Sequence, residues 1–185
     1  MTIGHAVVLI FDSASENRLI GQWRSTRAGM DLEGTGARPH LSLALFGPKV
    51  DLVRLSACVA EFAAQATPIS LSLTAVGAFP GEEGVVFLAP SPTSDLLTTH
   101  QCLHELLKLR SIPTEPSYQP ERWVPHCTMA LQVPHAEMPL AIETLRSAEV
   151  FGPIEIGHVV LLEYLPVKEV GSWQLTGART ASCET

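Results

Sequence analysis

The sequence predicts an α+β fold in which one supersecondary unit occurs twice. The chain has 185 residues, 46% of them hydrophobic and 17% charged, a composition typical of a globular protein that can bury a core. Patterns typical of strands and of helices alternate along it. Two apolar runs, "PHLSLAL" at 39–45 and "PHCTMAL" at 125–131, open with Pro-His, carry a hydroxyl residue two positions later and close with Ala-Leu.

The pattern of the first half of the chain predicts four strands and two helices. Residues 5–12, "HAVVLIFD", form a nearly continuous apolar run, which indicates a strand buried on both faces. Ser13 and Glu16 then have the spacing of a helix capping box, and Gly29 is suited to a helix end. The other predicted elements are a strand over 40–46, a helix near 52–66 ended by Pro68, and strands over 69–76 and 84–90.

The second half repeats this order of elements. Ser94 is expected to cap a helix that ends near Lys108 and Arg110, whose charges suit the negative end of the helix dipole. Three prolines then mark a loop that leads to the second Pro-His motif. The predicted elements after it are a helix near 136–148 and strands over 154–165 and 172–175, and residues 178–185 are expected to form a frayed tail.

The spacing of the two halves indicates an internal duplication. His126 lies 86 positions after His40, and Pro153 lies 85 positions after Pro68. A period of this length is too long for a solenoid repeat. We therefore expect one domain over 1–185 with two pseudo-symmetric lobes, motif 1 at 40–43 and motif 2 at 126–129.

The charge of the chain limits its partners. The formal net charge is −7 and the pI is about 5.4, and only 12 residues are Lys or Arg. A long surface that follows a nucleic-acid backbone needs clustered basic residues, so we expect none. A small nucleotide or an RNA 3' end remains possible as a ligand, and we expect the protein to be a monomer.

The N-terminus and the cysteines indicate a cytoplasmic protein. The first residues, "MTIGHAVVLIFD", lack the basic start and cleavage site of a signal peptide, and no apolar run approaches the length of a membrane span. The four cysteines are too scattered for a zinc site or a redox dithiol. Cys127 lies within motif 2, but on the strand face opposite its two polar neighbours. We expect neither a membrane partner nor a catalytic thiol.

Each motif is expected to present a polar stripe on one face of its strand. Side chains at i and i+2 share a face, which groups His40, Ser42 and Ala44 in the first motif and His126, Thr128 and Ala130 in the second. Burying such polar groups without partners would cost about 1–3 kcal/mol each, so they should face water or a ligand. If the two lobes face each other, both stripes line one cleft, and the small alanines leave space there.

Two imidazoles on one cleft could perform acid and base catalysis. An unperturbed imidazole has a pKa near 6.5, so one ring can accept a proton and the other donate one near neutral pH. In-line displacement at phosphorus needs such a pair, and Ser42 and Thr128 could donate hydrogen bonds to the phosphate oxygens. This chemistry requires no metal and no cofactor. A structural pair of histidines is the alternative.

Two other chemistries fit the motifs less well. A zinc site would need more ligands than two histidines, and no carboxylate or thiolate accompanies them in the motifs. A serine nucleophile is expected in a Gly-x-Ser-x-Gly turn, whereas Ser42 lies on a regular strand.

The paired motifs resemble those of a known family. "HLSL" and "HCTM", each preceded by Pro, with Trp123 two residues before the second Pro, are similar to the 2H phosphoesterase superfamily, in particular its bacterial 2'-5' RNA ligase-like branch of cyclic phosphodiesterases. The resemblance spans nearly the whole chain. It implies a bilobal fold of β-α-β-α-β units, with antiparallel sheets lining a central cleft and helices outside.

The resemblance also implies roles for the motif residues. His40 and His126 would be the acid and base, and Ser42 and Thr128 would bind phosphate, without a metal. The implied activity is the opening of 2',3'-cyclic phosphates of RNA ends or small nucleotides to 2'-phosphates. The alternatives are 2'-5' ligation of tRNA-like halves and a nucleotide-binding module without turnover.

Four further residues are candidates for lining the cleft. Tyr118, Arg122 and Trp123 precede motif 2, where an aromatic ring could stack on a base and a cation could meet phosphate. Arg38 has a similar position before motif 1. Trp123 could equally pack in the core, and Arg122 could be solvated.

Overall fold

The computed structural model describes residues 4–26, 29–81, 84–164 and 166–178. No helix within these ranges is long and apolar enough to cross a membrane. Of the tail expected to fray, only residue 178 lies within the described part of the chain.

The helices are α1 (Ser13–Thr26), α2 (Leu52–Gln65), α3 (Ser94–Leu109) and α4 (Met138–Arg146), with short 3-10 turns η1 (Pro116–Tyr118) and η2 (His135–Glu137). The strands are β1 (Gly4–Phe11), β2 (His40–Phe46), β3 (Ile69–Phe79), β4 (Gly84–Pro90), β5 (Cys127–Val133), β6 (Gly152–Tyr164) and β7 (Lys168–Gln174).

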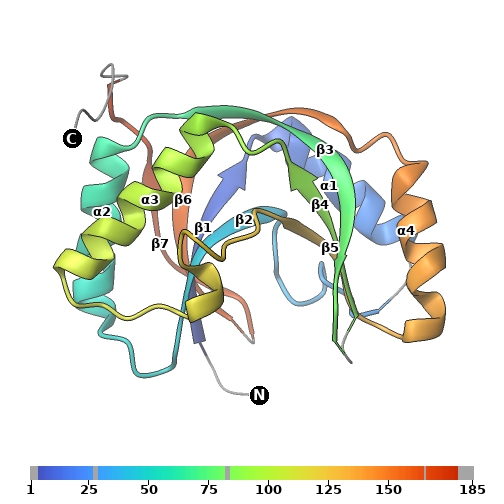
Figure 1. Ribbon diagram of the computed structural model, residues 1–185, viewed down its shortest axis with the longest axis horizontal. Helices are drawn as coiled ribbons and strands as arrows, with labels where there is room; N and C mark the ends of the chain where they lie inside the picture. The colour runs from blue at the N-terminus through green and yellow to red at the C-terminus, as the bar shows by residue number, and fades with distance from the viewer. Residues whose placement is uncertain (1–3, 27–28, 82–83, 165, 179–185) are drawn as a thin grey trace.

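All seven strands pair antiparallel in one sheet (Figure 1). The strand order is β2-β1-β6-β3-β4-β5, and β7 pairs with β6. The start of β6 pairs with β3, and the rest of it pairs with β1 and β7. The long β6 therefore joins the two antiparallel sheets that were expected, and the terminal strands of the order are the two motif strands, β2 and β5.

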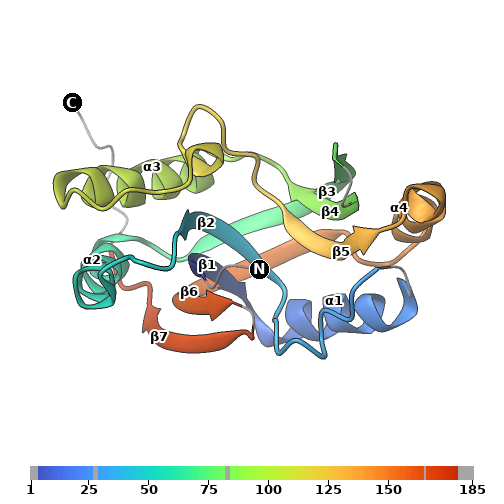
Figure 2. The same cartoon turned by 90° about the horizontal axis from the view of Figure 1, so that it is seen from below.

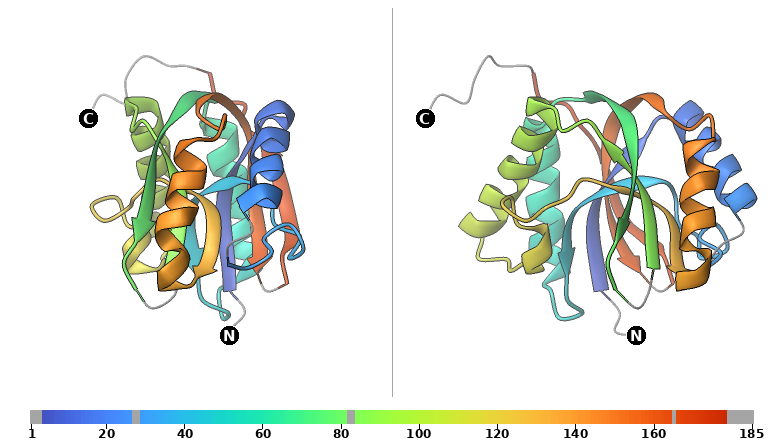
Figure 3. Two further views of the ribbon diagram at one scale, coloured as in Figure 1. Left: turned by 90° about the vertical axis from the view of Figure 1, so that its right-hand side faces the viewer. Right: turned by 45° about the vertical axis from the view of Figure 1, so that its right-hand side comes forward.

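The four described α-helices lie in two pairs on the two flanks of the sheet (Figure 2). α2 and α3 lie side by side on one flank, and α1 and α4 lie on the other, as the two views in Figure 3 also show. α1 contacts β5, and α3 contacts β2. Each of these helices therefore packs against the motif strand of the other half of the chain.

The helices cover one large core. It includes the fully buried Leu9, Phe46, Phe62 and Leu88, together with Trp123, which is 9% exposed. A smaller apolar cluster lies on another part of the β1-β2-β6 surface, and Leu45, Leu162 and Tyr164 pack at its border. This border is also part of the wall of the candidate site.

Two helix caps differ from the prediction by one residue. The Asp12 carboxylate accepts the backbone N–H of Ser15 at 2.9 Å, so Asp12 and not Ser13 caps α1. Thr93 and not Ser94 caps α3. Adjacent polar residues have similar capping preferences, and only the backbone path decides which side chain reaches the free N–H groups.

Candidate active site

A β-bulge interrupts each motif strand directly after its hydroxyl residue. The pairing of β2 with β1 skips Leu43, and the pairing of β5 with β4 skips Met129. These two residues occupy the same position of the two motifs, 86 residues apart. A bulge places an extra residue in one strand, so the alternation of faces changes beyond it.

The bulges overturn the prediction that Ala44 and Ala130 face the cleft. Ala44 is fully buried in the core and Ala130 is 1% exposed. The residues that line the cavity instead are Leu45 and Leu131. The prediction assumed a regular strand, in which the face would not have changed at Leu43 or Met129.

Residues of both motifs line one cavity of about 540 Å³. Its wall includes the four residues predicted from the sequence: His40, Ser42, His126 and Thr128. Much of the remaining wall is apolar, with Leu45, Phe79, Leu131, Leu162 and Val167 among its residues. The cavity therefore combines two imidazoles and two hydroxyls with apolar surroundings.

The two imidazoles are held in the same way. Nδ1 of His40 lies 2.6 Å from the carbonyl oxygen of Arg38, and Nδ1 of His126 lies 2.7 Å from that of Val124. A carbonyl oxygen only accepts, so each Nδ1 carries the hydrogen. In the neutral ring Nε2 is then a proton acceptor, which suits it to a general base.

Both imidazoles have pKa values below the ordinary 6.5. Burial is the main cause for His40 and for His126, and the hydrogen bond to the carbonyl opposes it. The positive charge that His126 carries when protonated lowers the pKa of His40 further. His126 is thus close enough to affect the protonation of His40.

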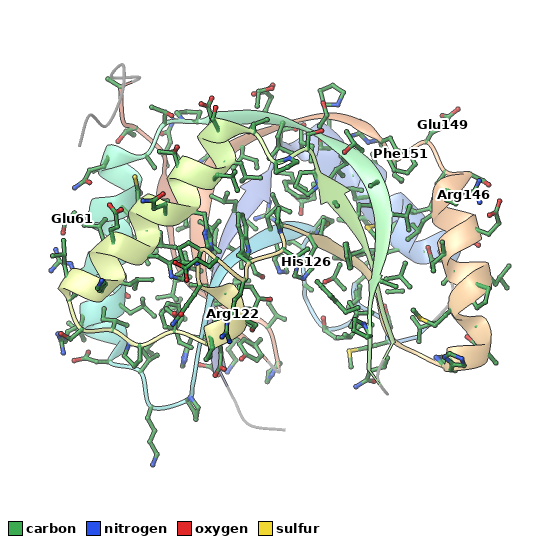
Figure 4. All side chains as sticks on the ribbon, viewed as in Figure 1. Glu61, Arg122, His126, Arg146, Glu149 and Phe151 are labelled. Atoms are coloured by element: carbon green, nitrogen blue, oxygen red, sulfur yellow. The ribbon has the colours of Figure 1, made fainter. Side chains whose placement is uncertain are left out.

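Two phenylalanines surround His126, which lies near the centre of the molecule (Figure 4). The ring centroid of Phe79 is 4.8 Å from that of His126 in an edge arrangement, and the centroid of Phe87 is 5.4 Å away. Sequence reasoning missed both residues. Their role depends on the pairing of β3 with β4 and of β4 with β5, and no local sequence pattern indicates it.

Tyr118 lines the cavity from the turn η1, as predicted. Burial raises its pKa to about 12, Tyr164 nearby adds to the rise, and the Ser42 side chain opposes it. The phenol therefore stays protonated at neutral pH and can donate a hydrogen bond beside Ser42.

Trp123 is both a core residue and part of the cavity wall. Its ring stacks on His100 with centroids 3.8 Å apart and an interplanar angle of 2°. Its Nε1–H is donated to the carbonyl oxygen of Ser42 at 3.0 Å. One face of the indole is therefore occupied by His100.

His100 and its neighbour His104 have a role that the sequence did not indicate. Both donate from Nε2 to the carbonyl oxygen of Leu43, at 3.0 and 3.1 Å. Burial lowers the pKa of His100 to about 4, and the charge of His104 contributes, so the ring is neutral at pH 7. Their spacing on one face of a helix was the only available signal.

The two candidate arginines have different positions. Arg122 is exposed and lines the cavity, and Figure 4 shows it on the side of the loop that leads to motif 2. The structure does not bring Arg38 into the cavity, in contrast to the expectation. Its guanidinium makes two hydrogen bonds of 2.6 Å to the Glu16 carboxylate, which was expected in a capping box.

The described residues do not favour a metal site or a cysteine nucleophile. Within these ranges, no three His, Cys, Asp or Glu side chains are grouped so that they could hold a metal ion. The Cys127 thiol is buried, and burial raises its pKa to about 12. The thiolate that a nucleophilic cysteine needs is therefore disfavoured there.

A family model described as the 2'-5' RNA ligase superfamily matches residues 11–167. No curated protein sequence matches the chain significantly. Solved structures are similar over nearly the whole chain. E. coli LigT in complex with 3'-AMP has a TM-score of 0.64 at 16% identity, covering 95% of this chain and 99% of that chain.

Two further structures support the same fold. TT0787 of Thermus thermophilus has a TM-score of 0.62 at 16% identity, with 94% of this chain and 98% of that chain covered. E. coli LigT in complex with ATP has a TM-score of 0.58 at 16% identity, with 95% and 99% covered. At these identities the likeness shows the fold alone, which is the α+β fold expected from the sequence.

Proposed function

We propose that this chain, which belongs to the 2'-5' RNA ligase superfamily of 2H phosphoesterases, is a metal-independent phosphodiesterase. It opens 2',3'-cyclic phosphates of RNA ends or small nucleotides to 2'-phosphates. The observation that carries the proposal is the matched pair of imidazoles. Both line one cavity, and each has Nδ1 bound to the carbonyl two residues before it, which leaves Nε2 for proton transfer.

The proposed reaction uses His40 and His126 on opposite sides of the phosphorus atom. Nε2 of the neutral ring takes a proton from water as the water oxygen bonds to phosphorus. The bond between phosphorus and the 3' oxygen breaks, and the protonated ring gives its Nε2 proton to that oxygen. Water is consumed, a 2'-phosphate and a free 3' hydroxyl form, and the rings exchange their protonation states.

Ser42 and Thr128 stabilise the phosphate in this reaction. Both hydroxyls lie on the cavity wall with the imidazoles. Donation to the non-bridging oxygens is strongest when negative charge builds there, so it lowers the barrier more than it strengthens substrate binding.

A small nucleotide is the proposed ligand. A cavity of about 540 Å³ is in the usual range for small-molecule sites, and its apolar wall and Tyr118 suit a nucleobase. Arg122 is a cation on the same wall. E. coli LigT has been solved in complex with 3'-AMP, with NADP+ and with ATP. The net charge of −7 argues against an extended RNA surface.

The proposal includes a monomer, in which a single chain supplies both motifs. It treats residues 1–185 as one domain with two pseudo-symmetric lobes. The bulges at Leu43 and Met129 and the matching Nδ1 contacts support this duplication. The scattered cysteines, of which Cys58 and Cys127 are free, support a cytoplasmic location.

The test is incubation with the four 2',3'-cyclic nucleotides and with short RNAs ending in a cyclic phosphate, in the presence of EDTA. We expect a 2'-phosphate product by phosphorus NMR. Activity that disappears with the chelator and returns with zinc would refute the metal-free mechanism. Bound nucleotide without any product would instead favour the binding module.

The pH profile provides a second measurement. The base must be neutral, so activity rises as pH passes its pKa, and the acid must be protonated, so activity falls as pH passes its own pKa. Both pKa values lie below the ordinary 6.5. We therefore expect a bell-shaped profile of kcat/KM with its maximum below pH 6.5.

A further inference from the structure

Each motif is held by a tryptophan from the other half of the chain. The indole Nε1–H of Trp23, on α1, is donated to the carbonyl oxygen of Thr128 at 3.2 Å. The indole Nε1–H of Trp123, before β5, is donated to the carbonyl oxygen of Ser42 at 3.0 Å. The two acceptors are the hydroxyl residues of the two motifs, so the acceptors occupy equivalent positions and the exchange between the two halves is reciprocal.

A second pair of contacts repeats this exchange three residues further along each strand. The backbone N–H of Met30 is donated to the carbonyl oxygen of Leu131 at 2.7 Å, and that of Glu115 to the carbonyl oxygen of Leu45 at 2.9 Å. Leu45 and Leu131 are again equivalent positions, and both line the cavity. Two carbonyls of each motif are thus bound by donors from the opposite half.

The position of the motif strands explains why these donors matter. β2 and β5 are the first and last strands of the sheet order, so one side of each has no strand partner among the described residues. Carbonyl groups on such an edge need another donor or water. The bulges at Leu43 and Met129 disturb the ladder at the adjacent hydroxyl residue. An indole donor fixes the peptide plane at this irregular point.

The two indoles are themselves fixed. Trp123 stacks on His100, and His100 donates to the carbonyl oxygen of Leu43, the bulge residue of motif 1. Trp23 is half-buried and packs against the large core, and it lines a surface pocket whose wall also includes Met129, the bulge residue of motif 2. Trp123 is therefore held by a residue that also binds the bulge of motif 1, and Trp23 is held by its packing against the core.

We propose that Trp23 and Trp123 are positioning residues that set the placement of the two catalytic motifs across the cavity. Neither donates to substrate, since each Nε1–H is committed to a backbone carbonyl. The hydroxyl residue whose carbonyl is bound lies two positions after the histidine of its motif. A shift of about 1 Å in such a group can lower the rate by about 10²-fold, which is why a backbone hydrogen bond can affect turnover.

The kinetic part of this inference rests on the proposed function, and its test compares three Trp→Phe variants. Trp23→Phe and Trp123→Phe keep an aromatic ring and lose the donor. Trp173→Phe is the matched control, because Trp173 on β7 is half-buried against the same core and lines no part of the cavity. We expect kcat to fall about 10-fold in the first two variants, KM to change less than about threefold, and the control to resemble the parent protein.

Two measurements do not depend on turnover. In the parent protein, the indole N–H signals of Trp23 and Trp123 should exchange with D₂O at least about tenfold more slowly than that of Trp173. In the Trp23 and Trp123 variants, the pKa of His40 should move up toward 6.5. Displacement of either motif admits water to the ring, whose burial is the main cause of its lowered pKa, and it also weakens the smaller contribution from the charge of His126. The same titration in Trp173→Phe, where we expect no shift, distinguishes this effect from a general loss of stability.

The outcomes separate the two proposals. If the parent protein hydrolyses no nucleotide, the proposed function fails, and the NMR measurements still decide the positioning role. An unchanged kcat and an unchanged pKa of His40 in both variants would overturn that role, as would a higher KM with kcat preserved. If a Phe variant does not fold, Trp is replaced by benzothienylalanine, which has a similar shape and lacks the N–H donor, and the same criteria apply.

Discussion

The two motifs share a backbone frame and differ in their surroundings. Each has a bulge after the hydroxyl residue, an Nδ1 contact to the carbonyl two residues before the histidine, and an indole donor from the other half. The neighbours of the two rings differ. Phe79 and Phe87 surround His126, whereas Tyr118 and the pair His100 and His104 lie beside motif 1.

Under the proposed function, this difference would let two similar motifs supply the acid and the base. The shared frame gives both imidazoles the same tautomer, so either Nε2 can exchange a proton. The different neighbours then change the two proton affinities separately. Acid and base catalysis needs one ring protonated and the other neutral at the same time, and identical surroundings would not favour either assignment.

The largest loss of activity should come from replacing either imidazole while its hydrogen bond to the backbone carbonyl is kept. In His40→Asn and His126→Asn, the side-chain amide can still donate to the carbonyl that binds Nδ1, but no group replaces Nε2. We expect kcat/KM to fall by about 10²–10⁴ in both variants with little change in melting temperature. His158→Asn on β6 is the control, because His158 lies outside the cavity wall. A large loss in only one of the two variants would show that the motifs do not act as a pair.

The hydroxyl residues should have the next largest effects. Ser42→Ala and Thr128→Ala each remove a donor to the phosphate, and we expect kcat to fall about 10–10²-fold. The loss should be greater for Ser42, because Tyr118 loses its neighbour as well. Ser42→Thr and Thr128→Ser keep the hydroxyl and should stay within about threefold of the parent protein. Steady-state kinetics on one cyclic nucleotide measures kcat for all four variants. An equal loss of kcat in the Ala variants and in the variants that keep the hydroxyl would refute the donor role.

The two arginines should differ in their effect on substrate binding, with smaller changes than those above. Arg122→Ala should raise KM about 10-fold, since a charge-assisted hydrogen bond contributes about 1.5–3 kcal/mol. Arg38→Ala should leave KM unchanged and remove only the partly exposed ion pair with Glu16, at a cost of about 0–1 kcal/mol in unfolding free energy. Kinetics and thermal denaturation of both variants check this. A raised KM in Arg38→Ala would show that the cavity extends further than its present wall.

The smallest effect concerns the ring neighbours of His126. Phe79→Leu should admit water to His126 and raise its pKa toward 6.5, because burial is the main cause of the lowered value. The pKa of His40 should change less, since Phe79 contacts the other ring. Titration of the ring protons by NMR measures both. Phe151→Leu is the control, because Phe151 lies outside the cavity wall. An equal shift of both histidines would contradict this reasoning.

Much of the fold could be predicted because its signals are local. The apolar run of β1, the helical stripe of α2 and the prolines before each motif reflect burial and backbone preferences of neighbouring residues. The sequence predicted a duplication because two copies of a short motif share their spacing with the prolines that follow them. The same repetition identified the two histidines and the two hydroxyl residues that share the cavity wall.

Only the tertiary structure decided which side chains accompany them. Because of the bulges, Leu45 and Leu131 line the cavity in place of Ala44 and Ala130. Arg38 pairs with Glu16, and the indoles of Trp23 and Trp123 donate to carbonyl oxygens in the opposite half of the chain. Each of these outcomes depends on strand register or on a partner distant in the chain. A local pattern carries the preference of a residue for burial or exposure, whereas the partner it meets is determined when the two halves pack together.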